Sequence, residues 1–158
     1  MPLTKAYFEH QFDALKRNVH HNKCKYVLVH MDGSNESFVA AAFCIRVFGS
    51  EKVLALITPD VHTKHIVAAG HCDALGIKTY TVPVTLGVAD ILNQIRIAGI
   101  VLPFEAIPKA SVLLSRDVVA LVSQALNAYV VDKYYLNDFE YTEFGRLYEL
   151  PDPEVSLL

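Results

Sequence analysis

The chain has 158 residues, of which 53% are hydrophobic and 20% are charged, and its formal net charge is −3. This length and composition fit one folded domain over residues 1–158 and exclude a disordered chain. The basic residues are scattered, which argues against a nucleic-acid surface, and no apolar run reaches the roughly 18 residues that a membrane-spanning helix needs. Three widely spaced cysteines suggest neither a disulfide framework nor a zinc knuckle, so we expect a cytoplasmic protein.

The first half of the chain alternates between helical and strand-like patterns. Apolar residues at helical spacing predict helices, at 2–21, 38–48 and 62–75. Short runs rich in β-branched residues predict strands, at 26–30, 53–57 and 77–84. Gly76 is the expected C-terminal cap of the third helix. This order predicts an α/β fold with three layers, α/β/α, around a mostly parallel sheet.

The pattern is looser in the second half. Helices are predicted at 88–100 and 116–131, on either side of a proline-bearing loop at 102–108. Five of the eight tyrosines lie between residues 129 and 148, where they either stack on a base or bury area against other parts of the protein. Pro151 and Pro153 mark an end that we expect to be frayed.

The loop at 31–37, Met-Asp-Gly-Ser-Asn-Glu-Ser, joins the first predicted strand to the helix that follows it. The backbone N–H groups at the start of a helix attract phosphate, and Gly33 permits a close approach. Asp32 and Glu36 oppose this reading because they place two negative charges where an anion would sit. The loop is nevertheless the best candidate for a nucleotide phosphate site.

Plainer interpretations of the same residues stay open. Ser34 or Asn35 equally serves as a simple helix N-cap, with Ser37 pointing at solvent. His62 and His65 lie three residues apart on a predicted helix and would suit zinc, but no cysteine or carboxylate pair completes the set. We therefore expect those two histidines to lie on a solvated helix face.

Residues 30–42, HMDGSNESFVAAA, resemble the SGGxDSS-plus-helix signature of NAD synthetases, which are ATP pyrophosphatases with an adenine nucleotide α-hydrolase fold. Further stretches follow in the family's order. They are 53–77, similar to its second strand, proline loop and helix; 116–125, similar to the helix after its paired arginines; 137–140, similar to Asn-Lys-Ser-Glu; and 142–146, similar to Thr-Lys-Tyr-Gly-Asp. The resemblance spans about residues 26–146 and implies a Rossmann-like fold.

In this family ATP converts the carboxylate of deamido-NAD to an adenylate, ammonia displaces AMP, and magnesium neutralises the triphosphate. The resemblance implies that an adenine nucleotide or dinucleotide binds after the first two strands. The implied cofactor-binding residues are Asp32, Gly33, Ser34, Asn35, Ser37 and Thr58. It also implies a magnesium ligand, Glu140, and a homodimer, which the apolar helix at 116–131 favours.

Several positions depart from the family's pattern. The loop aspartate that holds magnesium corresponds to Asn35, a neutral and poorer ligand, and Asp32 replaces the first glycine of the cradle. Glu143 and Arg146 reverse the charges of the lysine and aspartate in Thr-Lys-Tyr-Gly-Asp. We therefore expect an NAD synthetase-like protein that is weakly active or inactive. The alternatives are a non-catalytic nucleotide-binding protein and a purely structural, partner-binding dimer.

Overall fold

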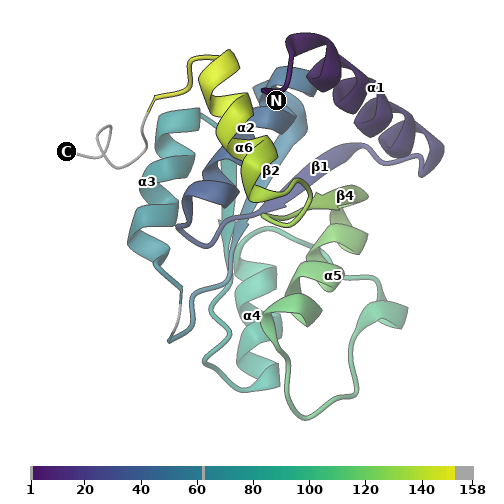
Figure 1. The fold of residues 1–158 in the computed structure, drawn as a ribbon. Helices are drawn as coiled ribbons and strands as arrows, with labels where there is room; N and C mark the ends of the chain where they lie inside the picture. Colours follow the sequence, from purple (N-terminus) through teal and green to yellow (C-terminus); the bar gives the residue numbers. More distant parts are fainter. Residues whose placement is uncertain (1, 62, 152–158) are drawn as a thin grey trace.

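Four parallel strands form the centre of the molecule, with helices on both faces (Figure 1). The computed structural model describes residues 2–61 and 63–151. The strands lie in the order β3-β2-β1-β4, and they are β1 (Tyr26–His30), β2 (Val53–Ile57), β3 (Lys78–Thr81) and β4 (Ala128–Val131). The first two match the predicted strands residue for residue, and the third is shorter than the predicted 77–84.

Six α-helices are assigned within the described residues. They are α1 (Lys5–His21), α2 (Asn35–Phe48), α3 (His65–Leu75), α4 (Val88–Ile97), α5 (Ser115–Leu126) and α6 (Asp138–Leu147). In Figure 1, α1, α2, α3 and α6 lie on one side of the sheet and α4 and α5 on the other, so the predicted α/β/α layering is confirmed. None of these helices has both the length and the apolarity needed to cross a membrane.

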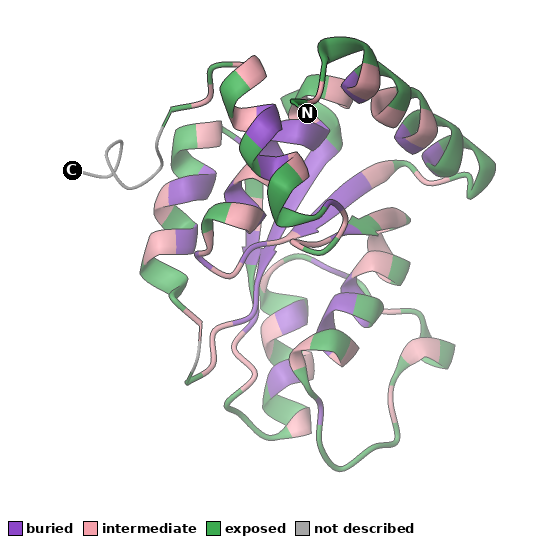
Figure 2. Cartoon of the chain, in the orientation of Figure 1, coloured by how far each residue is buried: buried purple, intermediate pink, exposed green. Residues whose placement is uncertain are grey.

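The layering follows from the alternation of side chains along each strand. In β1, Val27 and Val29 belong to the core shared with α1, α2, α3 and α6, whereas Leu28 belongs to the core shared with α4 and α5. All three side chains are at most 1% exposed, as expected for a parallel sheet covered on both faces. Figure 2 shows this burial concentrated in the strands and in the inward faces of the helices.

The predicted helix at 116–131 is wrong in its last third, because α5 ends at Leu126 and β4 follows immediately. Asn127 adopts a left-handed conformation with φ of 52°, which ends the helix and turns the chain into the sheet. β4 is an edge strand, but all four of its residues, Ala128–Val131, are hydrophobic, so its sequence continues the apolar pattern of the helix without a visible break.

The sheet has a topological switch point beside β1, where the order in which strands are added reverses. The chain runs from β1 to β2 and β3 on one side, and then returns to place β4 on the other side of β1. Ligands of open α/β sheets bind at such a point, outside the carboxyl ends of the strands. Here the segment 31–34 after β1 and the segment 132–137 after β4 meet, which defines where a site is expected.

Candidate functional site

The loop after β1 is held by its own side chains. Ser34 is the N-cap of α2, and its Oγ accepts a hydrogen bond from the Ser37 N–H at 3.2 Å. One oxygen of Asp32 accepts from both the backbone N–H and the hydroxyl of Ser34, at 2.9 and 2.5 Å. The cap interpretation is therefore right for Ser34. It is wrong for Ser37, which is fully buried and donates to the Ser34 carbonyl.

The second oxygen of Asp32 forms an ion pair with Lys133, which lies two residues beyond β4, at an Nζ–Oδ2 distance of 2.8 Å. Burial raises the pKa of Asp32, but the hydrogen bonds from Lys133 and Ser34 outweigh burial and hold that pKa well below its usual range. The Asp32 carboxylate in turn raises the pKa of Lys133. The negative charge that seemed to oppose phosphate is thus balanced by a cation from the neighbouring strand.

Gly33 is buried with a positive φ of +86°. A Cβ atom at this position would lie 2.6 Å from the carbonyl oxygen of Lys64, in the loop between β2 and α3. That loop therefore covers one side of the β1–α2 loop. The group that approaches Gly33 closely is the backbone of Lys64, not a ligand. The start of α2 borders a pocket on the β4 side.

His30 and Thr58 close the ends of β1 and β2. The His30 Nε2 lies 2.8 Å from the Thr58 hydroxyl, and Thr58 is 1% exposed. Burial lowers the pKa of His30, although Asp32, Asp132 and Asp60 act in the opposite direction. Thr58 thus lies beneath the carboxyl edge with its hydroxyl engaged by His30, and its assignment as a nucleotide-binding residue stays a prediction.

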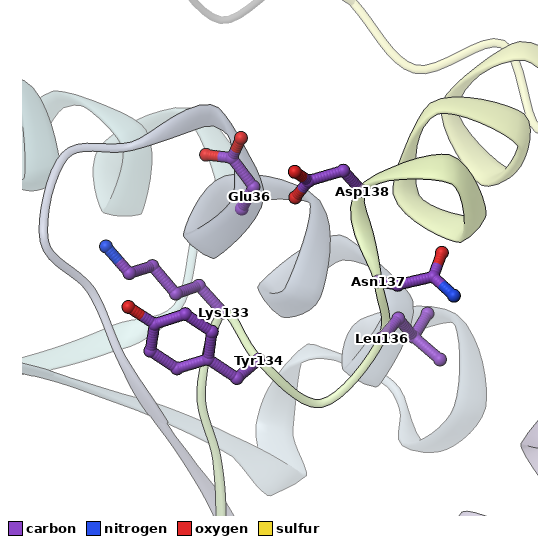
Figure 3. Close-up of a pocket in the computed structure, with 6 residues that line it drawn as sticks. All are labelled: Glu36, Lys133, Tyr134, Leu136, Asn137 and Asp138. Atoms are coloured by element: carbon purple, nitrogen blue, oxygen red, sulfur yellow. The ribbon is translucent and has the colours of Figure 1, made fainter.

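A pocket of about 490 Å³ opens on the β4 side of the loop. Figure 3 shows its lining, which comes from Glu36 at the start of α2 and from the segment between β4 and α6. The Asp138 carboxylate points toward Glu36, and Lys133 and Tyr134 extend in the same direction as each other, whereas Asn137 points away from them. Tyr134 is 80% exposed, so its ring is accessible from solvent.

Glu140, the expected magnesium ligand, is used elsewhere. Its Oε1 accepts the Asn137 N–H in the capping box of α6, and its Oε2 accepts the Tyr7 hydroxyl at 2.6 Å. Asn35 offers only a neutral, exposed amide. Over residues 2–61 and 63–151 no cluster of three or more histidine, cysteine or acidic residues is arranged to hold a metal. This donor set does not fit magnesium, and Glu140 as a ligand stays an untested prediction.

The two reversed charges of α6 pair with each other. The Arg146 Nε donates to the Glu143 carboxylate at 2.7 Å, and the other Glu143 oxygen accepts the Leu3 N–H. Glu143 is 7% exposed, and through its bond to Leu3 this pair fixes the N-terminal segment to α6. Of the paired histidines, His62 lies outside the described residues and His65 is exposed, as expected.

The structure brings Asp32, Ser34 and Ser37 together with Lys133, a residue that sequence reasoning missed. Asp132 and Lys133 follow two valines, and a pair of charged residues directly after an apolar run is a signal for the end of a buried strand. The signal was hidden because those valines were assigned to the predicted helix at 116–131.

Residues 7–123 match the family model described as NAD synthase, which covers well over half of the chain. The fold is similar to that of the NH3-dependent NAD synthetase from Campylobacter jejuni subsp. jejuni in complex with a nitrate ion, with 15% identity, a TM-score of 0.60, and coverage of 92% of this chain and 73% of that one. It is also similar to an NMN synthetase from Francisella tularensis, with 16% identity, a TM-score of 0.59, and coverage of 93% and 71%. No curated protein sequence matches the chain.

Proposed function

The chain belongs to the NAD synthase family, and we propose that it binds an adenine nucleotide at the carboxyl edge of its sheet while catalysing little or no ATP-dependent amide ligation. One observation carries the proposal. The Asp32–Lys133 ion pair borders an open pocket at the switch point of the sheet, whereas the residues expected to hold magnesium are neutral or engaged elsewhere.

Nucleotide binding is supported by the groups that converge on this pocket. The first N–H groups of α2 have no acceptor within the helix, although that of Ser37 is capped by Ser34, and the helix dipole adds positive potential there. Lys133 supplies a full positive charge, and the exposed ring of Tyr134 supplies a stacking surface. A nucleotide or dinucleotide would place its phosphate near the start of α2 and its base toward Tyr134.

Loss of ligation is supported by the donor set. Formation of an adenylate from ATP requires a divalent cation to neutralise the triphosphate as pyrophosphate leaves. Asn35 carries no charge, and both carboxylate oxygens of Glu140 accept hydrogen bonds from Asn137 and Tyr7. Without these ligands the transition state loses its principal charge stabilisation, so turnover is expected to be slow or absent.

Two measurements on the purified chain test the proposal. Thermal-shift titrations with AMP, ADP, ATP and NAD are expected to raise the melting temperature, since a ligand at about 100 times its Kd stabilises the folded state by roughly 2.7 kcal/mol. Incubation with ATP, deamido-NAD and ammonia is expected to release no pyrophosphate above background. A flat titration would contradict nucleotide binding, and steady pyrophosphate release would contradict the loss of ligation.

A second candidate function, a partner-binding homodimer, is favoured by a separate surface. The segment 97–114 between α4 and α5 exposes Val101, Phe104 and Val112 to 84%, 86% and 67%. The apolar residues of α5, in contrast, are buried in the protein's own core, so α5 itself does not supply an interface. Exposed apolar residues gathered in one segment are typical of a protein–protein contact.

A further inference from the structure

We propose that the nucleotide site works without a divalent cation and that the ammonium group of Lys133 takes the cation's place. The proposal rests on the proposed function and adds to it the class of ligand, a metal-free nucleoside monophosphate. Its geometric basis is the 2.8 Å ion pair between Lys133 and Asp32, together with the position of Lys133 in the lining of the pocket (Figure 3).

The ammonium group of Lys133 is held at the pocket, where a cation would neutralise a bound phosphate. The carboxylate of Asp32 is held in position, because its other oxygen accepts two hydrogen bonds from Ser34. Glu36, at the start of α2, acts on the same ammonium group through its charge. An ammonium group has three N–H donors; the ion pair with Asp32 uses one of them, and the nitrogen lies 5.4 Å from the centroid of the Tyr134 ring. A donor therefore remains for a phosphate oxygen that enters between β4 and α2.

The same charges disfavour a second cation and a long phosphate chain. The two positions that the resemblance assigns to magnesium supply no free carboxylate, because Asn35 is neutral and both oxygens of Glu140 accept hydrogen bonds, and a metal ion would also bind beside the positive Lys133. The pocket also contains the carboxylates of Glu36 and Asp138, which repel each additional phosphate that no metal neutralises. The site is therefore suited to one phosphate group, and we expect AMP to bind more tightly than ATP in the absence of metal.

Isothermal titration of the full chain with AMP, in EDTA and then in magnesium chloride, tests the proposal. The Kd is expected to change by less than about twofold between the two conditions. In EDTA, Lys133→Met is expected to weaken AMP binding by about tenfold or more, and Lys133→Arg to retain most of it, because arginine keeps the charge. Lys16→Met removes an exposed lysine of α1 and is the matched control, with no change expected.

A second variant is expected to change affinity in the opposite direction. Asp32→Asn removes the competing carboxylate and frees the ammonium of Lys133, so AMP should bind several-fold more tightly than to the wild type. The two side chains of the ion pair are 34% and 28% exposed, and partly exposed pairs of this kind contribute little to stability. Both variants should thus fold, which their melting temperatures without nucleotide would verify.

The outcomes separate the two proposals. AMP binding that disappears in EDTA and returns with magnesium would overturn the role of Lys133 while leaving nucleotide binding intact. Equal affinity of the wild type and Lys133→Met would overturn it as well. If the wild type binds no adenine nucleotide in either condition, the proposed function fails and the further inference fails with it.

Discussion

At the scale of single residues, the unusual charges of this chain occur in pairs. Asp32 is matched by Lys133 at 2.8 Å, and Glu143 is matched by Arg146 at 2.7 Å. Each of these side chains alone departs from the charges expected at a nucleotide site, whereas each ion pair is electrically neutral. The first pair stays at the candidate site and the second stabilises the packing of α6.

His71 is a buried histidine whose ring nitrogens have no hydrogen-bond partner among the described residues. Its ring is 1% exposed and lies edge-on to Phe38, with 5.0 Å between centroids. Burial lowers the pKa of His71 despite the opposing charge of Asp32. Below about pH 6.5 the unfolded chain therefore gains a proton that the folded chain resists, and the free energy of unfolding falls as the pH decreases.

His71→Leu should remove this part of the pH dependence. Because leucine leaves no unsatisfied polar atom, it should also retain or increase stability at neutral pH, by up to about 2 kcal/mol. Urea unfolding at about pH 7.5 and at about pH 5 measures both effects. His65→Leu changes an exposed residue of the same helix and should leave the pH dependence as it is. An unaltered pH dependence in His71→Leu would refute this role.

Gly33→Ala should be strongly destabilising for a reason unrelated to ligands. The new Cβ would meet the Lys64 carbonyl at 2.6 Å, in addition to the strain of a φ of +86°. Gly76→Ala shares the positive φ but has open space around it, so it should show only the backbone strain of about 1–2 kcal/mol. Chemical denaturation should place Gly33→Ala well beyond Gly76→Ala. Equal losses would show that the Lys64 contact yields at no cost.

At the scale of elements, the sequence predicted some units fully and merged others. The strands at 26–30 and 53–57 were predicted with the right bounds, because polar or turn-forming residues flank each apolar run. The helix α5 and the strand β4 were merged, because only Asn127 separates them and no proline or glycine marks the boundary. For the same reason Lys133 was not predicted as a site residue, because it follows the strand that was not predicted.

Asn127 should accordingly be sensitive to substitution. Its φ of 52° strains most residues, so Asn127→Ala is expected to destabilise the fold by about 1 kcal/mol or more. Asn127→Gly relieves the strain but loses the side-chain hydrogen bond to the Lys23 carbonyl, so it should be the milder change. Denaturant midpoints of the two variants give the order. A milder effect of alanine would mean that the turn does not set the boundary.

The segment 137–140 illustrates why a matching motif does not fix a role. Asn137 and Glu140 were matched to the two ends of the family's Asn-Lys-Ser-Glu segment, but in the structure they exchange capping hydrogen bonds at the start of α6. The spacing of a capping box explains both residues without a ligand. Sequence spacing could indicate that they act together, but only the fold shows that they act on a helix end.

At the scale of the whole molecule, two separate surfaces are available for binding. The candidate nucleotide site is at the carboxyl ends of β1 and β4, and the exposed apolar segment at 97–114 lies on the α4–α5 side (Figures 1 and 2). Sequence pattern predicted the three-layer fold and the edge that carries the loop. It did not predict the second surface, because exposure of an apolar residue depends on tertiary packing.

The apolar segment leads to a prediction about assembly. If 97–114 forms a homodimer interface, Phe104→Glu should convert a dimer to a monomer in sedimentation analysis, because a charge would be buried in an apolar contact. Phe139→Glu changes a phenylalanine of α6 that is 54% exposed, and it should leave the assembly unchanged. A wild-type monomer at high concentration, or a dimer that survives Phe104→Glu, would contradict this interface.

Hydrogen–deuterium exchange of the full chain with and without saturating AMP is the most direct test of the central claim, that a nucleotide binds where β1 and β4 end. Increased protection is expected in two segments, 31–38 around the start of α2 and 132–138 around Lys133, because both segments contribute to the candidate site. Protection confined to other parts of the chain, or no change at saturation, would contradict it.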